Sequence, residues 1–345
     1  MADHKLEFFK IRLRPSKKKY DGTFRDFSVD VLGADPDLSD SDISSILYEY
    51  FIDCLKGEHT HDKSKKKKIE FFDDTENNLY FTLKPKSYPS DFTIRGVLDG
   101  GPYGAQRLIR DIDNPETASR VRDTNVVASY FYVYVYLPPG GNVGCFGVHS
   151  HGMQENNSAT FRRFIKKIFL GPGYYAAETT IFCPKQIQEE FLDGGTVAEL
   201  RFTKSSVPLY HQNHGVREEL GLFKITVTAI PLDSETSGNS ARALSDKVGG
   251  YELGRDETDD EESFLTLNDF DRKKVQIQND RLKQSKSFFV SDIEETVKPA
   301  ININAFLELE PEIEPSFSQI DEFCDKFFKE TILEEIKPEQ TVRRL

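Results

Sequence analysis

The chain opens with a strand-like hydrophobic pattern and then changes to a helical one. HKLEFFKIRLR (residues 4–14) and FRDFSVDVL (24–32) are rich in β-branched and aromatic residues, which predicts two strands. SDSDISSILYEYFIDCLKG (39–57) starts with Ser and Asp, carries apolar residues at helical spacing and stops at Gly57. This third stretch predicts a helix.

The middle of the chain alternates strand and helix patterns around one strongly hydrophobic run. In VVASYFYVYVYL, tyrosine and valine alternate, which predicts a central strand. The pattern after it predicts strands at 143–149, 174–182, 196–204 and 221–230 and helices at 158–170 and 184–193. We therefore expect an α+β fold, a sheet-rich body with helices packed on one face, followed by an acidic C-terminal region.

Composition changes along the chain predict four regions. Residues 1–125 form a strand-rich N-terminal region with one helix, and residues 126–232 form a central α+β domain. The polar, glycine-containing segment 233–263 is expected to be an acidic linker or long loop. Residues 264–345 are predicted to be a C-terminal acidic α+β region, with its clearest helix at 323–336.

Composition also narrows the class of protein. The chain has 27 Phe and no Trp, so phenylalanine must fill much of the core. Its four cysteines form no C-x-x-C pair, and we expect reduced core thiols rather than a zinc ribbon or a disulfide framework. We recognise neither a signal peptide nor a long apolar segment, which predicts a cytoplasmic protein with no membrane contact.

Basic residues gather in one predicted helix although the net charge is -13. In SATFRRFIKKIF the apolar residues share one face, and no acidic residue pairs with the cations on the other face. The candidate polyanion-binding residues are these cations and a lysine run before them: Arg162, Arg163, Lys166, Lys167, Lys65, Lys66, Lys67 and Lys68. The helix face could be simply solvated, could contact phosphates, or could dock on the chain's own acidic C-terminal region. Because we recognise no motif that contacts bases specifically, nucleic-acid binding is expected to be independent of base sequence.

Two pairs of histidines are the candidate metal ligands. His149 and His151 lie two residues apart, so a strand would place both on one face, and HQNH supplies His211 and His214. Metal binding would require the two segments to meet, and ordinary strand-end and loop histidines are the alternative. We also expect His149 and His151 to be neutral, because cations on the following helix disfavour their protonation.

The order of features from YFYVYVYL through GVHSHG, ATFRRFIKKIF, ETTIFC, PKQIQEEFLDGG and TVAELRF carries a resemblance. It resembles the layout of bacterial phage-exclusion and anti-phage defence proteins of the RexA and KwaB type, and HKLEFFKIRLR resembles the first strand of several such families. The likeness covers residues 126–208 and that strand. It implies an intracellular immunity protein that engages DNA nonspecifically, often as a homodimer and with a protein partner encoded nearby.

Three functions therefore remain as hypotheses. The first is an anti-phage defence protein that binds nucleic acid without sequence specificity. The second is a metal-dependent hydrolase or nuclease that uses the two histidine pairs, and the third is a non-enzymatic adaptor that recruits a basic partner through its acidic C-terminal region. We find no nucleophile elbow or phosphate-binding loop, so a binding protein with no cofactor is favoured over an enzyme.

Overall fold

The structure is a computed structural model in which the chain forms two compact units. The first unit contains Met1–Pro184 and Ala300–Leu345, and the second contains Lys185–Pro299. The described residues are 4–16, 22–56, 60–70, 85–104, 107–110, 113–114, 118–123, 125–127, 129–151, 157–213, 216–232, 236–250, 252–255, 264–282, 284–293, 300–307, 309 and 313–336. The unit boundaries differ from those expected at 125, 232 and 263, because the chain returns to the first unit after residue 299.

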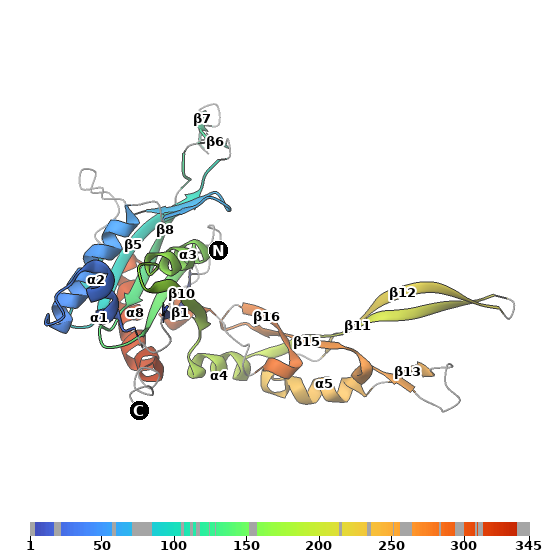
Figure 1. Cartoon of the computed structure of the whole chain (residues 1–345). Helices are drawn as coiled ribbons and strands as arrows, with labels where there is room; N and C mark the ends of the chain where they lie inside the picture. The colour runs from blue at the N-terminus through green and yellow to red at the C-terminus, as the bar shows by residue number, and fades with distance from the viewer. Residues whose placement is uncertain are drawn as a thin grey trace, which may run out of the picture. The chain divides into compact units, whose positions relative to one another are not determined.

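The first unit is built on an antiparallel sheet (Figure 1). Its strand order is β10-β1-β9-β8-β5-β3-β2. In addition, β17 pairs with β1 and β4 pairs with β5. The strands are β1 (His4–Pro15), β2 (His61–Asp62), β3 (Lys67–Glu70), β4 (Lys86–Tyr88), β5 (Thr93–Pro102), β8 (Ser129–Tyr136), β9 (Val143–His151), β10 (Tyr174–Phe182) and β17 (Ile301–Asn302). A separate hairpin joins β6 (Arg107–Arg110) and β7 (Ala118–Val121). The first predicted strand and the central strand are confirmed.

Helices cover both faces of this sheet. They are α1 (Phe24–Leu32), α2 (Asp40–Leu55), α3 (Ser158–Ile168), α7 (Ile303–Phe306) and α8 (Phe317–Phe327), which continues as the π-helical turn η5 (Phe328–Ile332). Phe131, Val133 and Val135 of β8 pack in one core with α1, α2 and α3. The alternating tyrosines of β8 point to the opposite face, towards α8. The α+β class is confirmed, but helices lie on two faces rather than on the one face expected.

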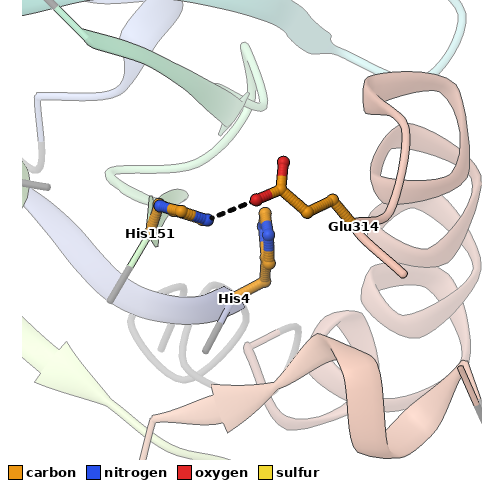
Figure 2. A group of neighbouring side chains, drawn as sticks. All are labelled: His4, His151 and Glu314. Carbon is orange, nitrogen blue, oxygen red and sulfur yellow. Dashed lines mark hydrogen bonds and ion pairs between the residues drawn. The ribbon is translucent and has the colours of Figure 1, made fainter. Parts of the chain in front are cut away.

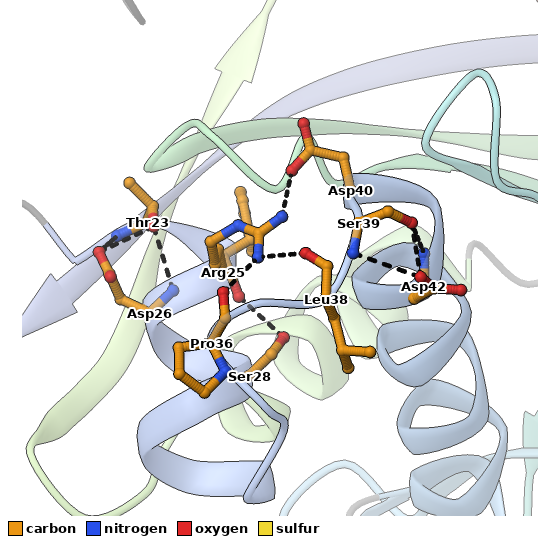
Figure 3. A network of polar contacts seen from close by, with 10 residues as sticks. Thr23, Arg25, Asp26, Ser28, Pro36, Leu38, Ser39, Asp40 and Asp42 are labelled. Atoms are coloured by element: carbon orange, nitrogen blue, oxygen red, sulfur yellow. Dashed lines mark hydrogen bonds and ion pairs between the residues drawn. The ribbon is translucent and has the colours of Figure 1, made fainter.

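The segment 24–32 is a helix, so the expected strand there is wrong. Thr23 and Asp26 form a capping box in which the Thr23 hydroxyl accepts from the Asp26 backbone N–H at 3.1 Å and Asp26 accepts from the Thr23 backbone N–H at 2.9 Å (Figure 3). The helix ends at Gly33, whose φ of 73° is left-handed. Phe24 and Phe27 are buried on its inner face. In the sequence, only the capping residues indicated a helix, because the nine residues of α1 also fit a strand pattern.

Arg25 ties α1 to the start of α2. Its guanidinium donates to the Leu38 carbonyl oxygen at 2.7 Å and pairs with Asp40 at 2.7 Å (Figure 3). Ser39 and Asp42 form a second capping box at the beginning of α2. The helix predicted over 39–57 is therefore confirmed over Asp40–Leu55, and Gly57 lies outside the described residues. Its first turn is held against α1.

The chain after residue 300 belongs to the first unit because it adds a strand and a helix to its sheet. In β17, Ile301 lies opposite Leu6 and Asn302 lies opposite Lys5 of β1. Residues 317–336 form the C-terminal helix that was expected at 323–336, with Ile320, Cys324 and other apolar side chains buried. This acidic segment is thus part of the structural core of the first unit.

The second unit contains a four-stranded sheet with the order β12-β11-β15-β16. Its elements are α4 (Lys185–Asp193), β11 (Thr196–Asn213), β12 (Val216–Ala229), η2 (Gly238–Ser240), α5 (Ala241–Gly249), β13 (Glu252–Arg255), β14 (Phe264–Thr266), η3 (Leu267–Asp269), β15 (Arg272–Asn279), β16 (Gln284–Phe289) and η4 (Val290–Asp292). The expected linker at 233–263 instead contains η2, α5 and β13, because Ala241 and Ser245 of α5 are fully buried. Residues 256–263 lie outside the described part.

Two expectations about composition can be compared with the structure. None of the four cysteines, each of which is described and buried, forms a disulfide. Among the described residues, no helix combines the length and the apolar character needed to cross a membrane.

Candidate functional site

Three histidines lie together where β1 pairs with β9. The register places His4 opposite His151 and Leu6 opposite His149. Side chains two residues apart on a strand share a face, so His149 and His151 point to the same side, as expected, and His4 joins them. The pairing of Gly147 with Tyr134 shows that this is the face covered by α8.

The imidazole rings are in direct contact. His4 Nδ1 and His149 Nε2 are 2.9 Å apart and share one hydrogen bond. The ring centroids of His4 and His151 are 4.4 Å apart in an edge-to-face arrangement. Phe317, the first residue of α8, packs edge-on against His149 with centroids 6.1 Å apart. The start of α8 therefore closes one side of the histidine cluster.

Glu314 completes the cluster from the segment that leads into α8. Its Oε1 lies 3.2 Å from His151 Nε2, with the His4 ring beside both groups (Figure 2). The segment is held by a hydrogen bond of 3.3 Å from Asn304 to the Ile313 carbonyl oxygen and by the Ser316 cap of α8. One side-chain atom from each of His4, His151 and Glu314 falls within 4.8 Å of the other two.

Burial keeps His149 neutral. The pKa of His149 is lowered to about 3, first by burial and then by the neighbouring His4 and His151. Neutrality was expected, but for a different reason, namely repulsion by the cations of α3. His149 Nδ1 is buried and has no hydrogen-bond partner in the described structure.

The two histidine pairs singled out in the sequence lie in different parts of the structure. His149 and His151 both lie in the cluster, whereas His211 lies on β11 of the second unit and His214 lies outside the described residues. His4 and Glu314 were missed, because they are 145 and 163 residues from their respective partners His149 and His151. Only the antiparallel register of β1 with β9 could have identified His4.

Of the predicted basic helix face, Arg162 packs back onto the sheet. Its guanidinium donates to the hydroxyl and to the carbonyl oxygen of Thr179 at 2.8 Å and 2.7 Å. It also lies 5.5 Å from the centre of the Phe9 ring. Arg162 therefore holds α3 against β1 and β10 rather than pointing freely outward.

Arg163 connects α3 to the lysine run. It forms an ion pair with Asp62, which is only 3% exposed, and donates to Ser64 Oγ at 2.8 Å. Asp62 and Ser64 belong to the β2–β3 hairpin, whose turn contains Lys65 and Lys66. The two basic segments recognised separately in the sequence thus meet in the first unit. We call Lys65, Lys66, Lys166 and Lys167 the basic surface.

The remaining lysines of the run belong to β3. Lys68 forms an ion pair with Glu70, and Lys67 is half-buried. Within the described residues, no ion pair involves a lysine of the basic surface. The acidic partner of α3 is Asp62, whereas α8 lies on the opposite face of the sheet, so the described contacts do not include docking of α3 on α8.

A buried carboxylate lies on the face of the sheet that carries the histidines. Asp99 of β5 is opposite Glu70 of β3 and is 7% exposed. Its Oδ1 has no hydrogen-bond partner among the described residues. The pKa of Asp99 is raised to about 6, first by burial and then by the negative charge of Glu70.

We expect Asp99→Asn to stabilise the protein at pH 7.5 by about 2 kcal/mol. The folded-state pKa of Asp99 is above its unfolded value, so ionisation costs stability as the pH rises from about 4 to about 6. Urea unfolding at pH 7.5 and at pH 4 measures this, and the gain should vanish at pH 4. The exposed Asp53→Asn is the control, and an Asp99→Asn variant no more stable than that control at pH 7.5 would contradict the assignment.

Comparison of the chain with protein-family models, with curated proteins and with solved structures found no match in any of the three.

Proposed function

We propose that the first unit binds nucleic acid through its basic surface, without sequence specificity. The contact of Arg163 with Asp62 and Ser64 carries this proposal, because it brings the lysines of the β2–β3 turn next to the cations of α3. Lysines attract phosphates as point charges, and contacts with phosphates carry no information about the base sequence. The resemblance to phage-exclusion proteins supports an anti-phage setting for this binding.

The structure divides seven of the eight candidate cations into two groups, and the eighth, Lys67, is half-buried on β3. Arg162, Arg163 and Lys68 have partners within the protein, namely Thr179, Asp62 and Glu70. Their charges therefore mainly stabilise the folded first unit. The four lysines of the basic surface are the ones expected to contact phosphates, because no described acid neutralises them. Lys65 and Lys66 are exposed, and Lys166 and Lys167 are partly exposed.

The test replaces all four lysines of the basic surface with Glu and leaves Arg162 and Arg163 intact. Binding to a labelled DNA duplex is measured by fluorescence anisotropy as a function of salt. If each lysine contacts one phosphate, wild-type affinity should fall roughly 100-fold between 50 and 200 mM salt. The variant should lose binding at low salt, and its circular dichroism spectrum should remain that of the wild type.

A matched control separates the surface from the net charge. Lys224, Lys247, Lys286 and Lys326 are exposed, and changing them to Glu alters the net charge equally. This control variant should retain most of the wild-type affinity. Equal loss in both variants, or no binding by the wild type at low salt, would rule out a nucleic-acid site at the basic surface.

A further inference from the structure

We propose that His4, His151 and Glu314 bind one divalent cation of the zinc class. This inference is independent of the basic surface, because it rests on side chains of β1, β9 and the segment before α8. Two imidazole nitrogens and one carboxylate oxygen form a ligand set that occurs in catalytic zinc sites.

The spacing of the three groups fits such an ion. Zinc binds nitrogen and oxygen ligands at about 2.0–2.2 Å, so two ligand atoms at a tetrahedral angle lie roughly 3.3 Å apart. His151 Nε2 and Glu314 Oε1 are 3.2 Å apart. All three ligand atoms fall within 4.8 Å of one another (Figure 2). Binding would require side-chain movements that bring any wider pair, at most 4.8 Å apart, to roughly 3.3 Å.

His149 is placed to orient His4 as a ligand. Histidines that bind a metal through one nitrogen usually donate a hydrogen bond from the other. His149 Nε2 lies 2.9 Å from His4 Nδ1 and can accept such a bond, which leaves the lone pair of His4 on Nε2. His149 therefore acts as a positioning residue and not as a ligand. His4 itself is buried, with 5% of its surface exposed.

Two of the three ligands come from paired strands, and the third is an exposed side chain. His4 and His151 project from paired strands, whereas the Glu314 side chain is 72% exposed. A cation held by three protein ligands keeps a fourth position, which water or a substrate oxygen could take. The cation would also link the entry of α8 to β1 and β9, so that binding should stabilise the first unit.

The experiment uses untagged full-length protein that has been treated with a chelator and then dialysed. Zn²⁺ binding is measured by equilibrium dialysis, and Co²⁺ is added as a spectroscopic probe of the ligands. The wild type should bind one Zn²⁺ that Glu314→Gln lacks, and Co²⁺ should give a visible absorption band. Glu314→Gln and His151→Ala should each weaken Zn²⁺ affinity by at least about 100-fold, and His4→Ala should do the same.

Two further variants make the result specific. His61→Ala removes a histidine of β2 outside the cluster and should bind Zn²⁺ like the wild type. His149→Gln should weaken binding by about 10- to 100-fold, as expected for a residue that orients a ligand. Because Glu314 is exposed, Glu314→Gln should fold even if a histidine variant does not.

The proposal is overturned if the wild type binds no more Zn²⁺ than Glu314→Gln does. In that case the His151–Glu314 contact is an ordinary hydrogen bond. Binding of Mg²⁺ or Ca²⁺ with no binding of Zn²⁺ would likewise reject a cation of the zinc class, because hard cations prefer all-oxygen ligand sets. Loss of DNA binding in the lysine variant has no bearing on this outcome.

Discussion

Replacing Phe161 with Ala is expected to reduce the free energy of unfolding of the first unit by about 4 kcal/mol. Phe161 is fully buried on the inner face of α3. Its ring makes edge-to-face contacts with Phe51 of α2, Phe131 of β8 and Phe146 of β9. Truncation removes these contacts and leaves a cavity where two helices and two strands meet. Urea unfolding followed by circular dichroism measures the loss.

Leu170→Ala is the matched control, because Leu170 follows α3 but is 57% exposed. We expect that change to cost less than about 0.5 kcal/mol. A similar small cost for Phe161→Ala would mean that α3 is not docked as described. The result also concerns function, because the same helix carries Lys166 and Lys167 of the basic surface. A variant with a displaced α3 should bind DNA more weakly than the wild type.

Replacing Arg95 with Met is expected to cost about 3 kcal/mol of stability, because it removes a buried cation and leaves two partly buried carboxylates with one cation fewer. Arg95 of β5 is 7% exposed and lies 3.1 Å from Asp325 of α8 and 3.5 Å from Asp91. Lys329 pairs with both carboxylates, at 2.9 Å from Asp91 and 3.0 Å from Asp325. Because Lys329 remains as a partner of both carboxylates, the loss of stability should be smaller than the largest losses that follow when a buried ion pair is broken.

A second variant identifies the cause of the loss. Arg95→Met combined with Asp325→Asn should recover part of the stability, because the uncompensated charge is removed with its partner. Lys56→Met, which breaks an exposed ion pair with Asp53, should cost less than about 0.5 kcal/mol and serves as control. If Arg95→Met is as mild as Lys56→Met, the charged contacts do not hold α8. Since Glu314 lies a short way before the Ser316 cap of that helix, Arg95→Met should also weaken the proposed zinc binding.

One hypothesis from the sequence was an adaptor whose acidic C-terminal region recruits a basic partner, and α8 belongs to that region. Two of its carboxylates instead serve the first unit itself. Asp321 accepts a hydrogen bond of 2.5 Å from the Tyr132 hydroxyl, and Asp325 pairs with Arg95. A sequence shows how many acidic residues a segment carries. It does not show which buried groups pair with them in the fold. The adaptor hypothesis therefore concerns only carboxylates that the fold leaves exposed.

Several elements could be predicted because their hydrophobic periodicity is local. The tyrosine and valine alternation of 129–136 and the apolar face of 158–168 place β8 and α3 correctly. The failure at 24–32 is equally local, since aromatic and β-branched residues favour a strand while the Thr23–Asp26 capping box begins a helix. In the fold, burial of Phe24 and Phe27 favours the helix. The segment 241–249 was missed because its core contacts come from small residues such as Ala241 and Ser245.

Local patterns also identified chemically interesting residues, namely the cations of α3, the lysine run and the pair His149 and His151. They could not show which of these act together, because that depends on contacts between distant segments. The pairing of β1 with β9 brings His4 to His151, and the docking of α8 adds Glu314. Likewise, the ion pair with the buried Asp62 gives Arg163 a role in stabilising the fold. Strand register and helix docking arise from burying the whole core, so the tertiary structure alone turns scattered side chains into a site.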